Sequence, residues 1–263
     1  MVHSPLFAQS TQFYLEDSIG QGLTTRIYLV GQPEAKAQVQ EALYAAVDHA
    51  REAAAKMQSE LDGINQQKTK GNIMVSAELA QAVHAGLELS GKTKGAFDLT
   101  AGSFRKVKVN LRNNSIKISG ANIQIDLAPI LKGFLADLIA DDLVKSGWPN
   151  CLVKIENIYV TRGSDIQKPW SIPVVVPSEK VAKRVLYYKT KMDQAAGATW
   201  SPTAAASPDL KSVTVFSKSG ANAEGLASTV YRMGLEEGKK FLSANKSLSA
   251  ILVDNQGNLT NVP

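Results

Sequence analysis

Apolar residues recur at helical spacing between residues 37 and 64, in an Ala-rich stretch that favours helix intrinsically. Pro33 precedes the stretch, at a position where proline commonly opens a helix. The pattern predicts one amphipathic helix of about thirty residues. Strand-like segments lie on both sides of it, so the chain must combine helices with a sheet.

Strands and further helices follow without a strict β–α–β alternation, which favours an α+β fold over a doubly wound one. The predicted strands are 13–15, 24–30, 107–109, 115–118, 123–125, 151–155, 158–161, 170–176, 187–189, 212–217 and 250–253, the last forming a terminal hairpin through the turn DNQG. The further predicted helices are 76–89, 130–145, 223–233 and 236–245. Residues 195–209, rich in Ala, Ser and Pro, are expected to form an exposed loop.

Composition excludes several classes of protein. The 263 residues carry 29 Lys and Arg against 24 Asp and Glu, and this modest, interspersed excess does not suit a nucleic-acid binder. No run approaches the roughly 20 apolar residues of a membrane helix. The single cysteine, Cys151, excludes an internal disulfide and a cysteine-based zinc site, and three histidines make a multi-histidine metal site unexpected. The first ten residues lack the features of a secretory signal, although a chain beginning after a removed signal would look the same.

Residues 125–137, IDLAPILKGFLAD, are the most informative segment. A predicted strand ends at Asp126, a short turn follows, and a helix opens with Lys132 and Gly133. Backbone N–H groups and a lysine near a helix N-terminus favour phosphate. An ordinary strand-to-helix junction with a surface lysine has the same pattern.

The complete pattern resembles the ApbE family, flavin transferases that move FMN from FAD onto a threonine or serine of a target protein. The family carries a VDLGGIAKGYAVD-like segment, with which IDLAPILKGFLAD aligns without a gap. Three further blocks agree in order: the helical segment ending in GAFDLT and Gly102 (75–102), SVTVFSKSGANAEGLASTVYRMGLEEG (212–238) and AILVDNQG (250–257). Four ordered blocks are more specific than one motif. The resemblance covers nearly the whole chain and implies one ApbE-like domain over residues 1–263, with two intimately joined α/β lobes around a cleft.

The resemblance also implies a FAD site with a magnesium ion beside the pyrophosphate. The matched FAD-binding positions are Asp126, Lys132, Gly133, Phe97, Asp98 and Thr100. The magnesium ligands would be the Leu131 carbonyl, Glu224 and Ser228, the last two standing where the family has Asp and Thr. A spacing of four places both side chains on one helix face, and both supply oxygen donors that suit a hard cation. The alternative is a surface acid and a helix-packing serine. No residue is assigned as catalytic.

Several positions depart from the family's pattern. Ala128 and Pro129 replace two glycines, and proline removes a backbone donor to phosphate. Glu156 stands in a turn that is glycine-rich in the family, where it would bring negative charge towards a bound pyrophosphate. The loop between residues 64 and 75 is shorter than usual. The family's H-x-x-D-P-x-T-G motif has no counterpart, since no histidine follows His84.

Two functions follow as alternatives. The first is a FAD:protein FMN transferase, in which magnesium-assisted attack of a protein hydroxyl on the FAD pyrophosphate releases AMP. The second is a catalytically inactive relative that serves as a binding or assembly partner in flavoprotein or redox-complex maturation; the departures favour it.

The resemblance implies a target protein with a D-x-x-[ST]-G-A-T motif. Residues 193–199 of this chain nearly match that motif, which would make Thr199 an acceptor. Such a short match in an Ala-rich segment also arises by chance. Family members usually act outside the cytoplasmic membrane, so a periplasmic or exported location is expected from the resemblance.

Overall fold

The structure is a computed structural model that describes residues 10–20, 22–67, 71–166, 168–176, 184–190, 194–200, 207 and 209–263. In this part of the chain an eight-stranded sheet forms the centre of the molecule, and every neighbouring pair of its strands is antiparallel. Its strands, in spatial order, are β1 (Thr11–Ile19), β2 (Leu23–Gly31), β6 (Cys151–Ile155), β7 (Ile158–Arg162), β10 (Gln194–Trp200), β11 (Leu210–Ser217), β12 (Ser249–Asp254) and β13 (Leu259–Val262). The combination confirms the predicted α+β fold.

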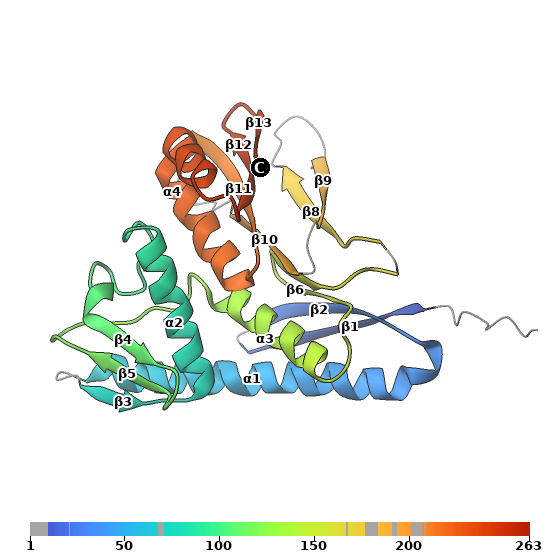
Figure 1. Cartoon of the computed structure of the whole chain (residues 1–263), viewed down its shortest axis with the longest axis horizontal. Coiled ribbons are helices and arrows are strands. Elements are labelled where there is room, and N and C mark those ends of the chain that lie inside the picture. Colours follow the sequence, from blue (N-terminus) through green and yellow to red (C-terminus); the bar gives the residue numbers. More distant parts are fainter. Residues whose placement is uncertain are drawn as a thin grey trace, which may run out of the picture.

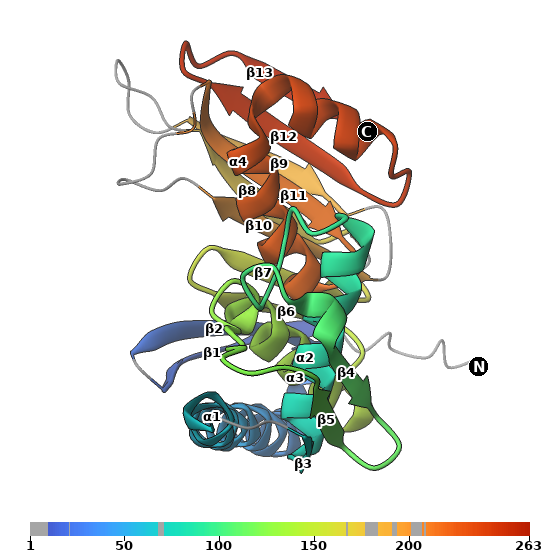
Figure 2. The same ribbon diagram turned by 90° about the vertical axis from the view of Figure 1, so that its left-hand side faces the viewer.

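The predicted long helix is α1 (Lys36–Gln66), which follows a 3-10 turn, η1 (Pro33–Ala35). Its buried residues, from Val39 to Ile64, lie on the apolar stripe recognised in the sequence. The helix runs alongside β1 and β2 and packs on α3 (Leu131–Lys145) (Figure 1). In Figure 2, α1 is seen nearly along its axis at one end of the molecule, with β12 and β13 at the other.

A second, smaller sheet lies beside α2 (Ala77–Lys92). Its strands are β3 (Asn72–Met74), β5 (Ser115–Ile118) and β4 (Val107–Asn110), and a 3-10 turn, η2 (Phe104–Lys106), leads into β4. Ser76 caps α2 as predicted, because its hydroxyl accepts a hydrogen bond from the Leu79 N–H.

The predicted strand at residues 123–125 is wrong. The Asn65 side chain accepts a hydrogen bond from the Ile125 N–H and donates one to the Ile125 carbonyl, so a side chain of α1 takes the place of a neighbouring strand. The apolar alternation that suggested a strand reflects burial of Ile123 and Ile125 in the core.

Two helices, α3 and α4 (Gly220–Ser243), cover the middle of the large sheet, α3 on β6 and β7 and α4 on β10 and β11. The two helices predicted at 223–233 and 236–245 are joined in α4 across a kink at Gly234, whose φ is 79° and ψ −175°. Only glycine adopts this conformation readily, which explains why the apolar pattern breaks at this point.

The hairpin of β8 (Ser171–Val176) and β9 (Arg184–Lys189) forms a separate two-stranded sheet near β10. The predicted exposed loop at residues 195–209 is wrong over its first part, because β10 pairs with β7 on one side and with β11 on the other. Small residues carry no alternating pattern, so this strand gave no signal. Residues 201–206 and 208 of that loop, and the side chain of Thr199, lie outside the part described.

Candidate functional site

The first turns of α3 and α4 lie in backbone contact. A Cβ built on Gly133 would come within 2.2 Å of the Gly220 carbonyl oxygen, and one on Gly220 within 2.6 Å of the Gly133 carbonyl oxygen. Only two facing glycines allow this approach. The contact brings Lys132 and Gly133, the KG segment, against α4, the helix that carries the expected metal ligands Glu224 and Ser228 (Figure 1).

Glu224, on α4, binds the N-terminal end of α3. Its Oε2 accepts a hydrogen bond from the Gly133 N–H at 2.8 Å, and its Oε1 lies 3.1 Å from the Lys132 ammonium nitrogen. The N-cap position of α3 is Ile130, which supplies no side-chain acceptor, so a carboxylate from a different helix fills the capping role. The carboxylate is 3% exposed, and burial raises the pKa of Glu224, while the Lys132 ammonium and the Gly133 N–H act in the opposite direction.

Asp137, on α3, caps the N-terminal end of α4. Its carboxylate accepts hydrogen bonds from the Gly220 N–H at 2.9 Å, the Ala221 N–H at 3.1 Å and the Ser219 hydroxyl at 2.9 Å. Burial raises the pKa of Asp137, and these donors oppose the rise. Each helix therefore caps the other. Sequence reasoning assigned no role to Asp137, although it is the last residue of the IDLAPILKGFLAD block.

The other two expected metal ligands are Ser228 and Leu131. Ser228 is buried one turn after Glu224, and its hydroxyl donates to the Gly225 carbonyl at 3.0 Å. Leu131 is the first residue of α3. Within the described ranges, no group of three His, Cys, Asp or Glu side chains is placed to share a metal ion. As arranged, these donors do not suit a divalent ion, because the Lys132 ammonium lies 3.1 Å from Glu224 Oε1 and would repel a second cation there.

The remaining expected FAD-binding residues lie in loops that meet near the same junction. Phe97 is buried, and a Cβ on Gly225 of α4 would come within 3.0 Å of its ring. The Asp126 N–H donates to the Leu99 carbonyl at 2.8 Å, which joins the GAFDLT stretch to the segment before α3.

Asp98 organises the GAFDLT turn from within. Its Oδ1 accepts from the N–H and the hydroxyl of Thr100, both at 2.7 Å, and its Oδ2 accepts from the Gly102 N–H at 2.9 Å. Through these hydrogen bonds, Asp98 and Thr100 stabilise the conformation of the loop.

Two residues that depart from the family's pattern, Pro129 and Glu156, lie in turns held by hydrogen bonds. Pro129 lies in a turn closed by a hydrogen bond from the Ile130 N–H to the Leu127 carbonyl. Glu156 lies in the turn between β6 and β7, and its Oε1 accepts a hydrogen bond from the Thr24 N–H of β2 at 3.0 Å.

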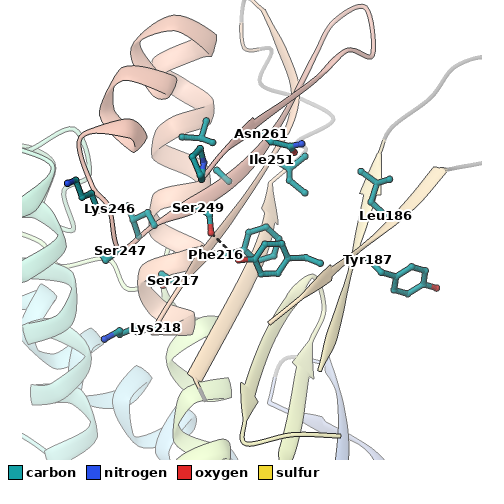
Figure 3. A pocket seen from close by; sticks show the side chains of 15 residues that line it. Leu186, Tyr187, Phe216, Ser217, Lys218, Lys246, Ser247, Ser249, Ile251 and Asn261 are labelled. Atoms are coloured by element: carbon teal, nitrogen blue, oxygen red, sulfur yellow. Dashed lines mark hydrogen bonds between the residues drawn. The ribbon is translucent and has the colours of Figure 1, made fainter. Parts of the chain in front are cut away.

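A pocket of about 880 Å³ lies between the β8–β9 hairpin and β11 to β13, and its lining includes Ser217 and Lys218, which directly precede Ser219, the N-cap of α4. Phe216 and Tyr188 stack in its wall with ring centroids 3.7 Å apart, and the Tyr188 hydroxyl lies 3.1 Å from the Ser249 hydroxyl. Figure 3 shows Lys218 and Lys246 on the opposite side of the pocket from Tyr187. Of the described residues that line it, none is a site residue expected from the sequence.

Among the helices described by the structure, none has the length and apolar character needed to cross a bilayer.

Comparison with known proteins agrees with the fold and with the ordered blocks. The sequence model of the ApbE family matches residues 21–108 and 101–252. The FAD:protein FMN transferase of Vibrio cholerae serotype O1 is 25% identical over 236 residues, covering 72% of this chain and 70% of that protein. The structure of the flavin transferase ApbE from Vibrio cholerae superposes with a TM-score of 0.78 at 21% identity, covering 96% of this chain and 97% of that one. The apo form of the Pseudomonas stutzeri flavinyl transferase ApbE gives 0.80 at 20% identity, covering 98% and 96%. The chain is therefore a distant member of the ApbE family.

Proposed function

We propose that this chain is an ApbE-type flavin transferase that binds FAD in a cleft between two joined lobes and moves FMN to a target protein. A threonine or serine hydroxyl oxygen of the target would attack the phosphorus of the FMN half. The bond from that phosphorus to the bridging oxygen would break, AMP would leave with the bridging oxygen, and the hydroxyl proton would pass to water.

The observation that carries the proposal is the convergence of three family blocks on the α3–α4 junction. The KG segment contacts Glu224 through Lys132 and Gly133, and Phe97 of the GAFDLT stretch reaches α4 beside Gly225. Lys132 is 27% exposed, so a charged side chain of this junction reaches solvent, where we expect it to meet a phosphate. Asp126, Lys132, Gly133, Phe97, Asp98 and Thr100 are the residues proposed to surround FAD.

Magnesium does not enter this proposal, because the Lys132 ammonium already stands as a cation beside the Glu224 carboxylate. The chain's own residues would bind and orient the pyrophosphate. Positioning supplies much of the catalysis in phosphoryl transfer, and the ion pair with Glu224 fixes the start of α3, so we expect transfer to depend strongly on Lys132.

A second candidate is an inactive relative that serves as a binding or assembly partner in flavoprotein maturation. The specific observation in its favour is that Glu224 fills the anion site formed by the α3 N-terminus and Lys132. The absence of a histidine after His84 favours it as well. The target with a D-x-x-[ST]-G-A-T motif and a periplasmic or exported location are proposals that rest on the family.

A transfer assay separates the two candidates. The chain is incubated with FAD and a protein carrying a D-x-x-[ST]-G-A-T segment, and covalent flavin is read by in-gel fluorescence and by mass. We expect labelling by the natural chain and by Lys145→Ala, a control at the exposed end of α3. Lys132→Ala should lose labelling, as should a target whose acceptor hydroxyl is replaced by alanine. Saturation with FAD and no labelling would favour the assembly partner.

A further inference from the structure

The Glu224 carboxylate is a buried anion that needs a neighbouring cation. It is 3% exposed, and a carboxylate removed from water to this extent is stable only when it is paired and hydrogen-bonded. The Gly133 N–H satisfies Oε2 at 2.8 Å, and the Lys132 ammonium lies 3.1 Å from Oε1. Both needs are therefore met by the first turn of α3.

The Lys132 ammonium lies 3.1 Å from Oε1 of Glu224, one of the three residues expected to bind a divalent ion. A magnesium ion coordinated by Glu224 would sit within a few ångströms of this ammonium, and two cations at that distance repel strongly in a site screened from water. Ser228, one turn after Glu224, does not offset this repulsion between two cations. Its hydroxyl donates to the Gly225 carbonyl and carries no charge.

We propose that Lys132 is the resident counter-ion of Glu224 and takes the place of a divalent metal, so that the α3–α4 junction is complete without one. The inference rests on the proposed function in one respect: binding of FAD by this chain should be independent of magnesium. It also makes Lys132 a positioning residue, because the ion pair fixes the start of α3 against α4.

The inference predicts that a metal site appears when the ammonium is removed. Lys132→Met keeps most of the aliphatic stem of the side chain but leaves the Glu224 carboxylate buried without a cation. The variant should therefore lose thermal stability and regain part of it when a divalent ion binds. Lys145→Met, on the exposed end of the same helix, is the matched control.

Binding of Mn2+, followed by electron paramagnetic resonance, tests this directly, because Mn2+ takes the same oxygen donors as magnesium. We expect no bound Mn2+ in the natural chain, one bound ion in Lys132→Met, and loss of that ion in Lys132→Met/Glu224→Gln. Thermal melts of each variant with and without Mn2+ check that the variants fold.

Two results would overturn the inference. One is a bound Mn2+ in the natural chain that Glu224→Gln removes and Glu237→Gln, an exposed acid on the same helix, retains. The other is a folded Lys132→Met variant that binds no Mn2+. A failure of FAD to bind would count against the proposed function only, since the Mn2+ measurements use no flavin.

Discussion

Replacing Gly133 by alanine should destabilise the protein, although alanine is the better helix former. The new Cβ would lie 2.2 Å from the Gly220 carbonyl oxygen and 2.5 Å from the Ala221 nitrogen. Both are backbone atoms of α4 and cannot rotate away. Carbon and oxygen atoms that are not bonded approach to about 3.3 Å, so the two helices must separate by about 1 Å.

The magnitude follows from three contributions. Overpacking of a core contact costs about 1–3 kcal/mol. Separation also lengthens the hydrogen bonds from Gly133 to Glu224 and from Gly220 to Asp137, and the loss of one cap costs about 1 kcal/mol. Alanine returns about 1 kcal/mol of helix propensity. We expect a net loss of about 2 kcal/mol in the free energy of unfolding and a fall in Tm of about 4–8 °C.

The assay is urea unfolding followed by circular dichroism, together with a thermal melt. Gly63→Ala is the matched control, because Gly63 lies in α1 and a Cβ there meets nothing within 4 Å. That variant should gain about 0.5–1 kcal/mol. If Gly133→Ala is as stable as the natural chain or more stable, the close α3–α4 approach and the reasoning built on it are wrong.

Three further predictions concern other parts of the fold. The Asp142 carboxylate, 2.5 Å from the Nδ1 of His49, raises the pKa of that histidine, so the ion pair stabilises the fold below about pH 6.5 and is lost as the pH rises through the folded-state pKa. The urea midpoint should therefore fall as the pH rises above about 6.5, and His49→Gln should flatten that fall; an equal fall in the variant would contradict the assignment. Burial raises the pKa of the Cys151 thiol to about 12, so a disulfide reagent should react with it only after unfolding, whereas rapid reaction of the native chain would show an exposed thiol. Gly234→Ala should cost about 1–3 kcal/mol, because φ is 79° and the new Cβ would lie 2.9 Å from the Asp209 carboxylate; unchanged urea unfolding would argue against the kink.

The sequence predicts correctly those helices whose signals come from neighbouring residues. The stripe of α1 and the Ser76 cap of α2 are patterns of neighbouring residues, and both are confirmed. The strand β10 could not be read, because its Ala and Gly residues show no alternation and its position depends on β7 and β11. Residues 123–125 show the opposite case: their apolar alternation predicts a strand, but the backbone of Ile125 bonds to the Asn65 side chain and to no strand that the structure describes.

The candidate site was only partly accessible from the sequence. The KG segment and α4 were recognised through the ordered blocks, and the structure brings Lys132, Gly133 and Glu224 together. Their mutual contacts could not be foreseen, because capping of one helix by an acid of another depends on where the helices cross. For the same reason Asp137 had no predicted role, and Glu224 was expected to face a metal ion and not an ammonium.

Calorimetric titration with FAD, in a chelator and again in magnesium, shows whether this chain binds the flavin and whether a divalent ion takes part. We expect FAD to bind with the same Kd in both solutions, because Lys132 already neutralises Glu224. Binding that requires magnesium would keep the flavin function and contradict the role given to Lys132. No binding at high FAD concentration would contradict the proposed flavin transferase function and leave an ApbE fold that serves a flavin-independent role.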